Sequence, residues 1–266
     1  MRRLFQAAIM AAMLTTVLSC GKGEPNFDPA NYKDWSKYSV GHFTTYCDPK
    51  SVWASQLKEL TQGYDRFLIE ISAILEMPAP EQHIDLYVYA PGPQNKEMTG
   101  RDLPFFTDST IHWDGLYPYG YEITKFLLAK KGIEPGKFRV MNEGVPHLLD
   151  FSGFNYHDKA NRLVNSGKFV GLAELGDNAR FDSIAFSVRR AESASLCGYI
   201  MYNYGLERLF MVWKSSVDWQ RSIETIFQLP IDDFEKQWIS FARANAIDSA
   251  GTMDNDTVKD VRISVQ

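Results

Sequence analysis

Two short groups of polar residues have the types and spacing that could do chemistry. Tyr121, Glu122 and Lys125 stand at relative positions 1, 2 and 5. An Asn-Glu-Gly sequence follows, and its glutamate, Glu143, lies 21 residues after Glu122. Residues at i and i+4 share a face of a helix. A carboxylate beside such a pair can act as a general base, a metal ligand or an ion-pair partner.

Hydrophobic periodicity predicts a helix around each group. Ile123, Phe126 and Leu127 form the apolar stripe of the first helix, and Gly132 ends it in a left-handed cap. Asn142 is the expected N-cap of the second helix. Because Pro146 would then fall inside that helix and cost it a hydrogen bond, we expect a distorted or late start.

This layout resembles the gluzincin metallopeptidases of the peptidase MA type. In that family the first helix carries His-Glu-x-x-His and the second an Asn-Glu-Gly that supplies the third zinc ligand. The resemblance places Tyr121 and Lys125 at the zinc-binding histidines, Glu122 at the general base and Glu143 at the third ligand. It implies a zincin-like α+β fold over residues 36–246, with a small mixed N-terminal sheet packed on helices and a helical C-terminal half.

Both histidines of the family motif are missing here. An ammonium at Lys125 has no lone pair for a metal at neutral pH, and a tyrosine phenol with a pKa of about 10 is a poor ligand. The resemblance therefore implies an inactive, zinc-free domain that binds or scaffolds a peptide or another envelope protein. Lys125 could replace the metal's charge by pairing with Glu122 or Glu143, or it could extend to solvent.

A rearranged metal site is the alternative. Glu143 and His147 are four residues apart and Asp150 is seven from Glu143, so all three would share one face of a regular helix. His112 and His157 are the nearest further nitrogen donors in the sequence. Such a site would hold zinc or another divalent ion and support a metal-dependent peptidase or hydrolase. The competing interpretation is that His147 only packs on a helix surface.

The N-terminus is typical of an exported protein. Residues 1–19 read as a signal peptide, with a basic start and an apolar run. The ending Val-Leu-Ser-Cys resembles a bacterial lipobox, which implies a lipidated Cys20 and an envelope protein tethered to a membrane, facing the periplasm or the exterior. An ordinary signal cleaved nearby is the alternative. Residues 20–35 then form a polar linker, and residues 247–266 a polar tail.

Charge and cysteine content bear on the class of partner and on the state of the two remaining cysteines. The formal net charge of -5, with scattered lysines and arginines, argues against a nucleic-acid partner. Cys47 and Cys197 either form a disulfide, which an exported protein permits, or stay as two buried thiols.

The other elements follow from hydrophobic patterns. Strands are expected at Tyr38–Cys47, at Ile84–Ala90 with one buried face, and within Leu103–Trp113, with a loop at Pro91–Thr99. A long amphipathic helix should open at Asp48-Pro49 and run to Leu75, and later helices are expected at 156–164, 187–204, 223–229 and 231–239. In gluzincins an edge strand near residues 103–113 pairs with extended peptide, so the resemblance implies a similar strand here.

Overall fold

The computed structural model describes residues 32–92, 94–115, 117–133 and 135–246. The predicted signal peptide, Cys20 and the polar tail lie outside these residues. The fold is mixed α and β, as predicted. It divides into two compact units: unit 1 runs to Glu134 and includes Leu149–Ser152, and unit 2 comprises Pro135–Leu148 and the chain from Gly153 onward.

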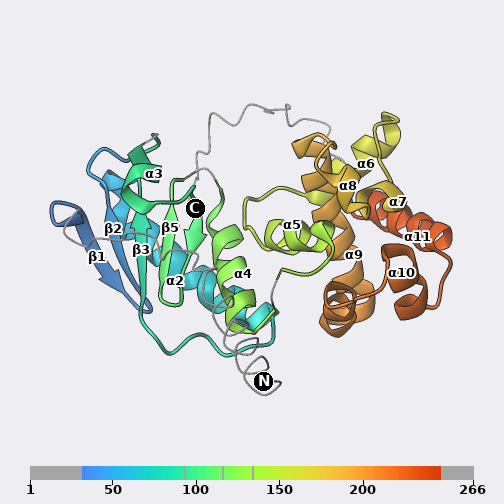
Figure 1. The fold of residues 1–266 in the computed structure, drawn as a ribbon, viewed down its shortest axis with the longest axis horizontal. Coiled ribbons are helices and arrows are strands. Elements are labelled where there is room, and N and C mark those ends of the chain that lie inside the picture. Colours follow the sequence, from blue (N-terminus) through green and yellow to red (C-terminus); the bar gives the residue numbers. More distant parts are fainter. Residues whose placement is uncertain (1–31, 93, 116, 134, 247–266) are drawn as a thin grey trace, which may run out of the picture. The chain divides into compact units, whose positions relative to one another are not determined.

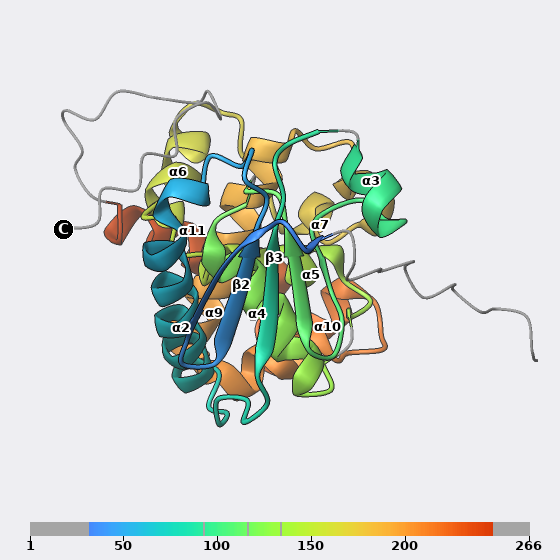
Figure 2. The ribbon, with the colours of Figure 1, turned by 90° about the vertical axis from the view of Figure 1, so that its left-hand side faces the viewer.

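Unit 1 is built on a five-stranded mixed sheet (Figures 1 and 2). The strand order is β1-β2-β3-β5-β4. The pairs β2–β3 and β3–β5 are parallel, whereas β1–β2 and β4–β5 are antiparallel. The short strand β4 therefore lies at the edge of the sheet. The bounds are β1 Ser36–Val40, β2 Phe43–Cys47, β3 Ile84–Val88, β4 Phe105–Phe106 and β5 Thr110–Trp113.

The first predicted strand is in fact a hairpin. Residues 38–47 split into β1 and β2 around Gly41, whose φ is +52°, a value that favours glycine. Asp65 fixes this turn, because its Oδ1 accepts the backbone N–H of His42 at 2.8 Å and lies 2.7 Å from His42 Nδ1. The turn escapes a local pattern search because its acidic partner comes from a helix more than twenty residues away.

Helix α2 (Leu57–Ile74) and, further along the chain, helix α4 (Tyr119–Lys130) pack against each other and against the sheet (Figure 2). In α2, Leu60, Tyr64, Leu68 and Ile71 form the predicted apolar stripe, and all are buried. The helix begins at Leu57 after the short 3-10 turn η2 (Ala54–Gln56), so the predicted start at Asp48-Pro49 was wrong. Asp48 instead holds a local turn by accepting the N–H of Lys50. The predicted loop at 91–99 also contains a helix, α3 (Gln94–Thr99).

The other face of the sheet carries a row of stacked rings. Tyr46, Tyr87, His112 and Phe105 are register partners on four adjacent strands, with successive centroids 4.9, 5.0 and 4.3 Å apart. Tyr32 packs over this row. Consequently β3 is buried on both faces, and the prediction of a single buried face was wrong.

The chain reaches the first motif helix through β5. The indole N–H of Trp113 donates to the carbonyl of Tyr117 at 2.9 Å. Helix α4 (Tyr119–Lys130) then begins after Pro118, and Gly132, with φ +70°, follows its end, where the sequence predicts a left-handed cap. The backbone N–H of Gly120 donates to the carbonyl of Asp150 at 3.2 Å, so the start of α4 lies directly against the Leu149–Ser152 segment.

Unit 2 is helical in its described part (Figure 1). Helix α9 breaks at Gly205, where φ is 83° and ψ is 168°. The break directly follows residue 204, where the sequence predicts that this helix ends. The helices are α5 (Arg139–Leu148), α6 (Tyr156–Asn165), α7 (Leu172–Leu175), α8 (Asn178–Phe181), α9 (Phe186–Trp213), α10 (Trp219–Phe227) and α11 (Ile231–Ala244).

The second motif helix starts earlier than predicted. Helix α5 begins at Arg139, so Asn142 is a helical residue rather than the N-cap. The Asn142 side chain instead accepts the N–H of Gly136 and donates to its carbonyl. Pro146 lies inside the helix. Gly144 packs against α9, where an added Cβ would lie 2.5 Å from the carbonyl oxygen of Ser193.

Two glycine substitutions test the packing of unit 1. A Cβ at Gly120 would lie 2.1 Å from the carbonyl oxygen of Leu149. We therefore expect Gly120→Ala to lower the free energy of unfolding by about 1–3 kcal/mol. At Gly63 on α2 the nearest atom is 3.8 Å away in the Tyr119 ring, so Gly63→Ala should be neutral or stabilise by up to about 1 kcal/mol through helix propensity. Urea denaturation measures both, and equal stabilities would contradict the packing.

Candidate functional site

The tyrosines at the start of α4 hold the helix in place. The Tyr119 ring packs against Trp53, Tyr64 and Trp113, with centroids 5.1 to 5.8 Å away. Tyr121 points elsewhere and stacks on Tyr117 at 4.8 Å. Alternate tyrosines thus pack into two different clusters, which fixes the rotation of α4 about its axis.

This rotation buries Glu122 completely. Its exposed fraction is 0%, and among the described residues neither carboxylate oxygen has a hydrogen-bond partner. The Lys125 ammonium lies 3.6 Å from Glu122 Oε2, and also 5.2 Å from the centroid of the Tyr121 ring. The Lys125 side chain is one-third exposed, so the pair joins the buried acid to a partly exposed side chain. Of the alternatives for Lys125, the structure contains the pair with Glu122.

The environment of Glu122 shifts its titration strongly. Burial raises the pKa of Glu122 to about 7, against the opposing effect of Lys125, and the nearby Asp114 raises it further. Near neutral pH the group is therefore divided between its charged and neutral forms. Perturbed acids of this kind are common at functional sites, although structural ion pairs produce them as well.

Glu143 lies in a separate charge network within unit 2. Its Oε2 is 3.4 Å from Nε of Arg189, and Arg189 Nη1 is 3.5 Å from Asp182. Asp182 also contacts the guanidinium of Arg139. The side chains of Glu143 and Arg189 are both about four-fifths buried. Sequence spacing gives no signal for Arg189, because it comes from α9, well separated along the chain.

The alternative metal ligands divide between the two units. Glu143 and His147 belong to unit 2 and Asp150 to unit 1. Helix α5 ends at Leu148, so Asp150 does not continue their helix face, and that expectation was wrong. Asp150 Oδ1 instead accepts the N–H of Ser152 at 2.8 Å. In the described part of the chain, no group of three or more His, Cys, Asp or Glu could hold a metal ion.

The histidines contribute to the interior of their own units. His147 is buried between the rings of Tyr156 and Phe186, each about 6 Å away. His112 lies 2.7 Å from the Tyr89 hydroxyl, and burial lowers its pKa to about 3. His157 lies 3.0 Å from Ser195 Oγ. Burial lowers the pKa of His157 to about 4, so it and His112 are neutral at physiological pH.

The two cysteines of the described chain are buried free thiols. This is the second of the two predicted alternatives. Burial raises the pKa of Cys47 to about 11 and that of Cys197 further still. Since the thiolate is the reactive form, neither cysteine is suited to act as a nucleophile at neutral pH.

No protein-family model and no curated protein matches this chain. The gluzincin resemblance therefore depends on the motif spacing and the order of elements in this chain alone. In the residues that the structure describes, no helix combines the length and apolarity needed to cross a bilayer.

A second buried acid was missed by sequence reasoning. Glu192 on α9 has an exposed fraction of 0%, and its Oε1 accepts the backbone N–H of Val170 at 3.0 Å. Burial raises its pKa to about 7. The residue stands in an ordinary helical pattern, so only its packing in the folded chain reveals it.

The raised pKa of Glu122 predicts a pH-dependent stability. The folded chain keeps the proton up to about pH 7, whereas an unfolded glutamate loses it near pH 4.5, so stability falls as the pH rises between these values. At about 1.4 kcal/mol per pKa unit, this shift lowers the free energy of unfolding by about 3 kcal/mol as the pH rises through the two values. Glu122→Gln should abolish this loss. Between pH 5 and pH 8, the stability of the variant should therefore rise by about 3 kcal/mol relative to that of the wild type.

Urea denaturation at the two pH values measures this difference. Glu81→Gln, an exposed position in the same unit, is the control and should follow the wild type. Glu192→Gln should remove a similar part of the pH-dependent loss of stability, because the pKa of Glu192 is also raised to about 7. An unchanged pH dependence in Glu122→Gln would mean that Glu122 is not the buried acid described above.

Proposed function

We propose that this chain is a gluzincin-like module of the bacterial cell envelope, tethered through a lipid on Cys20, that binds or scaffolds peptide rather than cleaving it. One observation carries the proposal. At both acidic positions of the family layout, the carboxylate contacts a cation of its own chain. Glu122 lies 3.6 Å from Lys125, and Glu143 lies 3.4 Å from Arg189.

These pairs disfavour the zinc chemistry of the family. At Glu143 a divalent ion would have to displace a guanidinium, and at Glu122 it would be repelled by an ammonium. The two imidazole ligands are also replaced by Tyr121 and Lys125, which are poor metal ligands near neutral pH. The charges at these positions are already balanced without a metal.

The order of elements in unit 1 supports the gluzincin-like part of the proposal. A mixed sheet precedes α4, and the strand at its edge, β4, is antiparallel to β5, the last strand before the helix. This is where the resemblance calls for a peptide-pairing edge strand. In the described part of the chain β4 pairs with β5 alone. An extended peptide could therefore add to its outer side by backbone hydrogen bonds.

The ion pair on α4 can be tested by removing its cation. Lys125→Ala leaves the buried Glu122 carboxylate without its cation, and Glu122 can take up a proton instead, so we expect a loss of about 1–2 kcal/mol of unfolding free energy at pH 8. The loss should shrink at pH 5, where Glu122 is protonated. Lys58→Ala, an exposed position on α2, should change stability little. Equal stability of Lys125→Ala and wild type at pH 8 would remove the main support for the proposal.

Zinc affinity tests the family layout itself. We expect the wild-type chain to bind no stoichiometric zinc, and the double variant Tyr121→His, Lys125→His to gain a site with Glu122 between its imidazoles. Calorimetric titration with zinc measures the affinity of both proteins.

Two results would contradict the proposal in different ways. Stoichiometric zinc on the wild-type chain would make the zinc-free interpretation wrong and direct mutation to Glu143 and His147. A folded double variant that gains no zinc affinity would mean that the gluzincin layout is wrong. Thermal unfolding of each variant confirms that it is folded before the titration is interpreted.

A further inference from the structure

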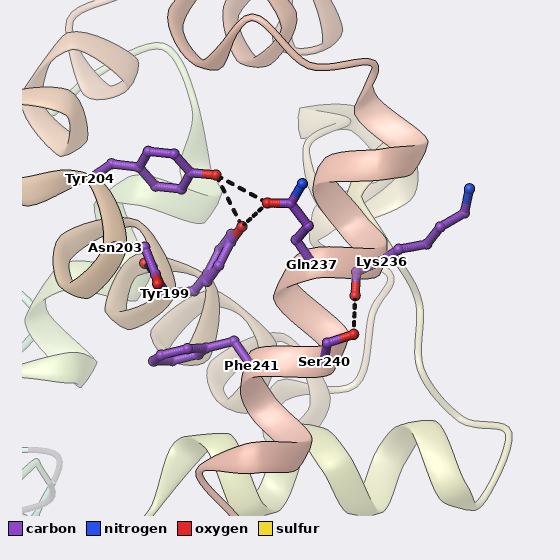
Figure 3. Close-up of a pocket in the computed structure, with 7 residues that line it drawn as sticks. All are labelled: Tyr199, Asn203, Tyr204, Lys236, Gln237, Ser240 and Phe241. Atoms are coloured by element: carbon purple, nitrogen blue, oxygen red, sulfur yellow. Dashed lines mark hydrogen bonds between the residues drawn. The ribbon is translucent and has the colours of Figure 1, made fainter.

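The pocket of about 500 Å³ between α9 and α11 does not offer a convergent set of polar groups (Figure 3). The hydroxyl of Ser240 donates to the carbonyl of Lys236 at 2.8 Å. The hydroxyls of Tyr199 and Tyr204 lie 3.2 and 3.3 Å from Gln237 Oε1. These groups therefore satisfy one another within unit 2. Of the two units, unit 1 carries the better candidate, at the free edge of its sheet.

The row of stacked rings in unit 1 ends in a cation at this edge. His112 covers one face of the Phe105 ring, with the two centroids 4.3 Å apart. The guanidinium of Arg101 also lies over this ring, with its Cζ 5.6 Å from the centroid. Since His112 occupies the inner face of the ring, the guanidinium takes the outer one. Each ring of the row stands on its own strand, so Arg101 fills the place that a side chain of an added strand would take.

The backbone of Arg101 is fixed where α3 ends. The hydroxyl of Thr99, a residue that is 1% exposed, accepts the N–H of Arg101 at 3.3 Å and lies 2.8 Å from its carbonyl oxygen. The charge of the guanidinium reaches the stacked row, because it adds to the effect of burial in lowering the pKa of His112. Arg101 is therefore held in position at the edge of the sheet.

The hydrogen-bond pattern of the β4–β5 hairpin shows which backbone groups face outward. Thr107 donates its N–H to the carbonyl of Thr110 at 2.9 Å, so these two residues form a hydrogen-bonded pair. Such pairs alternate with non-bonded pairs along an antiparallel ladder. Phe106 and Ile111 are the next pair along and are therefore non-bonded. The N–H and C=O of Phe106 thus point away from β5 and are available to an added strand.

The charge at this edge favours an acidic partner. The two acids beside β4 already lie near lysines: Asp102 Oδ1 is 3.0 Å from Lys96 Nζ, and Asp108 Oδ1 is 3.9 Å from Lys130 Nζ. Arg101, by contrast, has no ion pair among the described residues. The edge therefore carries one cation more than it carries acids. A carboxylate beside Arg101 would pair with a guanidinium that is already in place.

We propose that the β4 edge binds extended peptides with acidic side chains, and that Arg101 is the residue that selects them. Successive side chains of a strand point to opposite faces. A peptide residue bonded to Phe106 therefore has its neighbours on the face of Phe105, beside Arg101. A carboxylate there would form a charge-assisted hydrogen bond with the guanidinium. This inference rests on the proposed peptide-binding role of β4 and adds the class of peptide.

The test uses the full chain and three peptides that carry the same fluorophore: Ser-Glu-Thr-Glu-Thr-Glu-Ser and its analogues with Gln or Lys in place of every Glu. Alternation places the variable side chains on one face of an extended peptide. By fluorescence polarisation, we expect the Glu peptide to bind about threefold or more tightly than the Gln peptide, and the Lys peptide to bind most weakly. Arg101→Gln should make the Glu and Gln peptides bind equally. The matched control is Arg66→Gln on α2, because Arg66 also lies over a phenylalanine ring, at 4.8 Å, and it should leave the preference unchanged.

A second pair of variants tests the backbone of the edge. Phe106→Pro and Phe106→Ala both remove the ring that packs on Phe126, but only proline also removes the outward N–H. We expect Phe106→Pro to bind the Glu peptide about fivefold or more weakly than Phe106→Ala does. Thermal unfolding confirms that each variant is folded before its binding is interpreted.

Four results would overturn the proposal. Equal binding of the Glu and Gln peptides to the wild type, with weaker binding to Phe106→Pro, would leave the peptide edge intact and make selection by Arg101 wrong. Tighter binding of all the peptides to Arg101→Gln would show that Arg101 shields the edge instead. Binding of none of the peptides would make the peptide-pairing role of β4 wrong, and this proposal with it. Self-association of the wild type that Phe106→Pro abolishes, measured by sedimentation, would show that the edge pairs with a second copy of the chain and not with peptide.

Discussion

The burial of the Glu122 carboxylate is the constraint on which the arrangement of α4 depends. Moving a carboxylate out of water costs several kcal/mol, and an ion pair offsets this cost only in part. Lys125 supplies that ion pair from one turn away, with its ammonium 3.6 Å from Glu122 and its side chain one-third exposed. The ring of Tyr121 lies beside the same ammonium. Three residues of one motif, Tyr121, Glu122 and Lys125, thus lie together, and this local interaction needs no ligand from outside.

The sheet explains why Glu122, rather than a neighbour, is the residue that becomes buried. Trp113 at the end of β5 fixes the approach to α4 through its bond to the Tyr117 carbonyl. Tyr119 then packs among aromatic rings from α2 and β5, and Gly120 meets the backbone of Asp150. With these two contacts set, the helical period turns Glu122 into the interior and places Lys125 beside it on the same face, where Lys125 is one-third exposed. The position of the acid follows from packing, and its pKa follows from the position.

Features carried by local periodicity could be predicted from the sequence, and features made by distant partners could not. The stripe of α2, the extent of α4 and the break at Gly205 each depend on neighbours three or four residues away. The pair of Glu122 with Lys125 is equally local. By contrast, Arg189 reaches Glu143 from another helix, and Asp65 closes the β1–β2 turn from α2.

The same distinction accounts for the errors within single elements. Tyr87 alternates with apolar residues, which is typical of a strand with one solvent-exposed face. The rings of Tyr46 and Tyr32 nevertheless pack on Tyr87 and bury that face as well. Asn142 has the chemistry of an N-cap, but its side chain satisfies Gly136, and the helix starts at Arg139 instead. In both cases a tertiary contact overrode a sound local preference.

The distribution of charge is the feature of this fold that supports the proposed function without a metal. A zinc ion in the gluzincin layout would balance both glutamates at once, whereas here each glutamate is balanced inside its own compact unit, Glu122 by Lys125 and Glu143 by Arg189. Neither unit therefore needs a metal, or the other unit, to neutralise its acid. A protein organised in this way holds these two largely buried acids in ion pairs within each unit, which supports the proposed role in recognition without zinc chemistry.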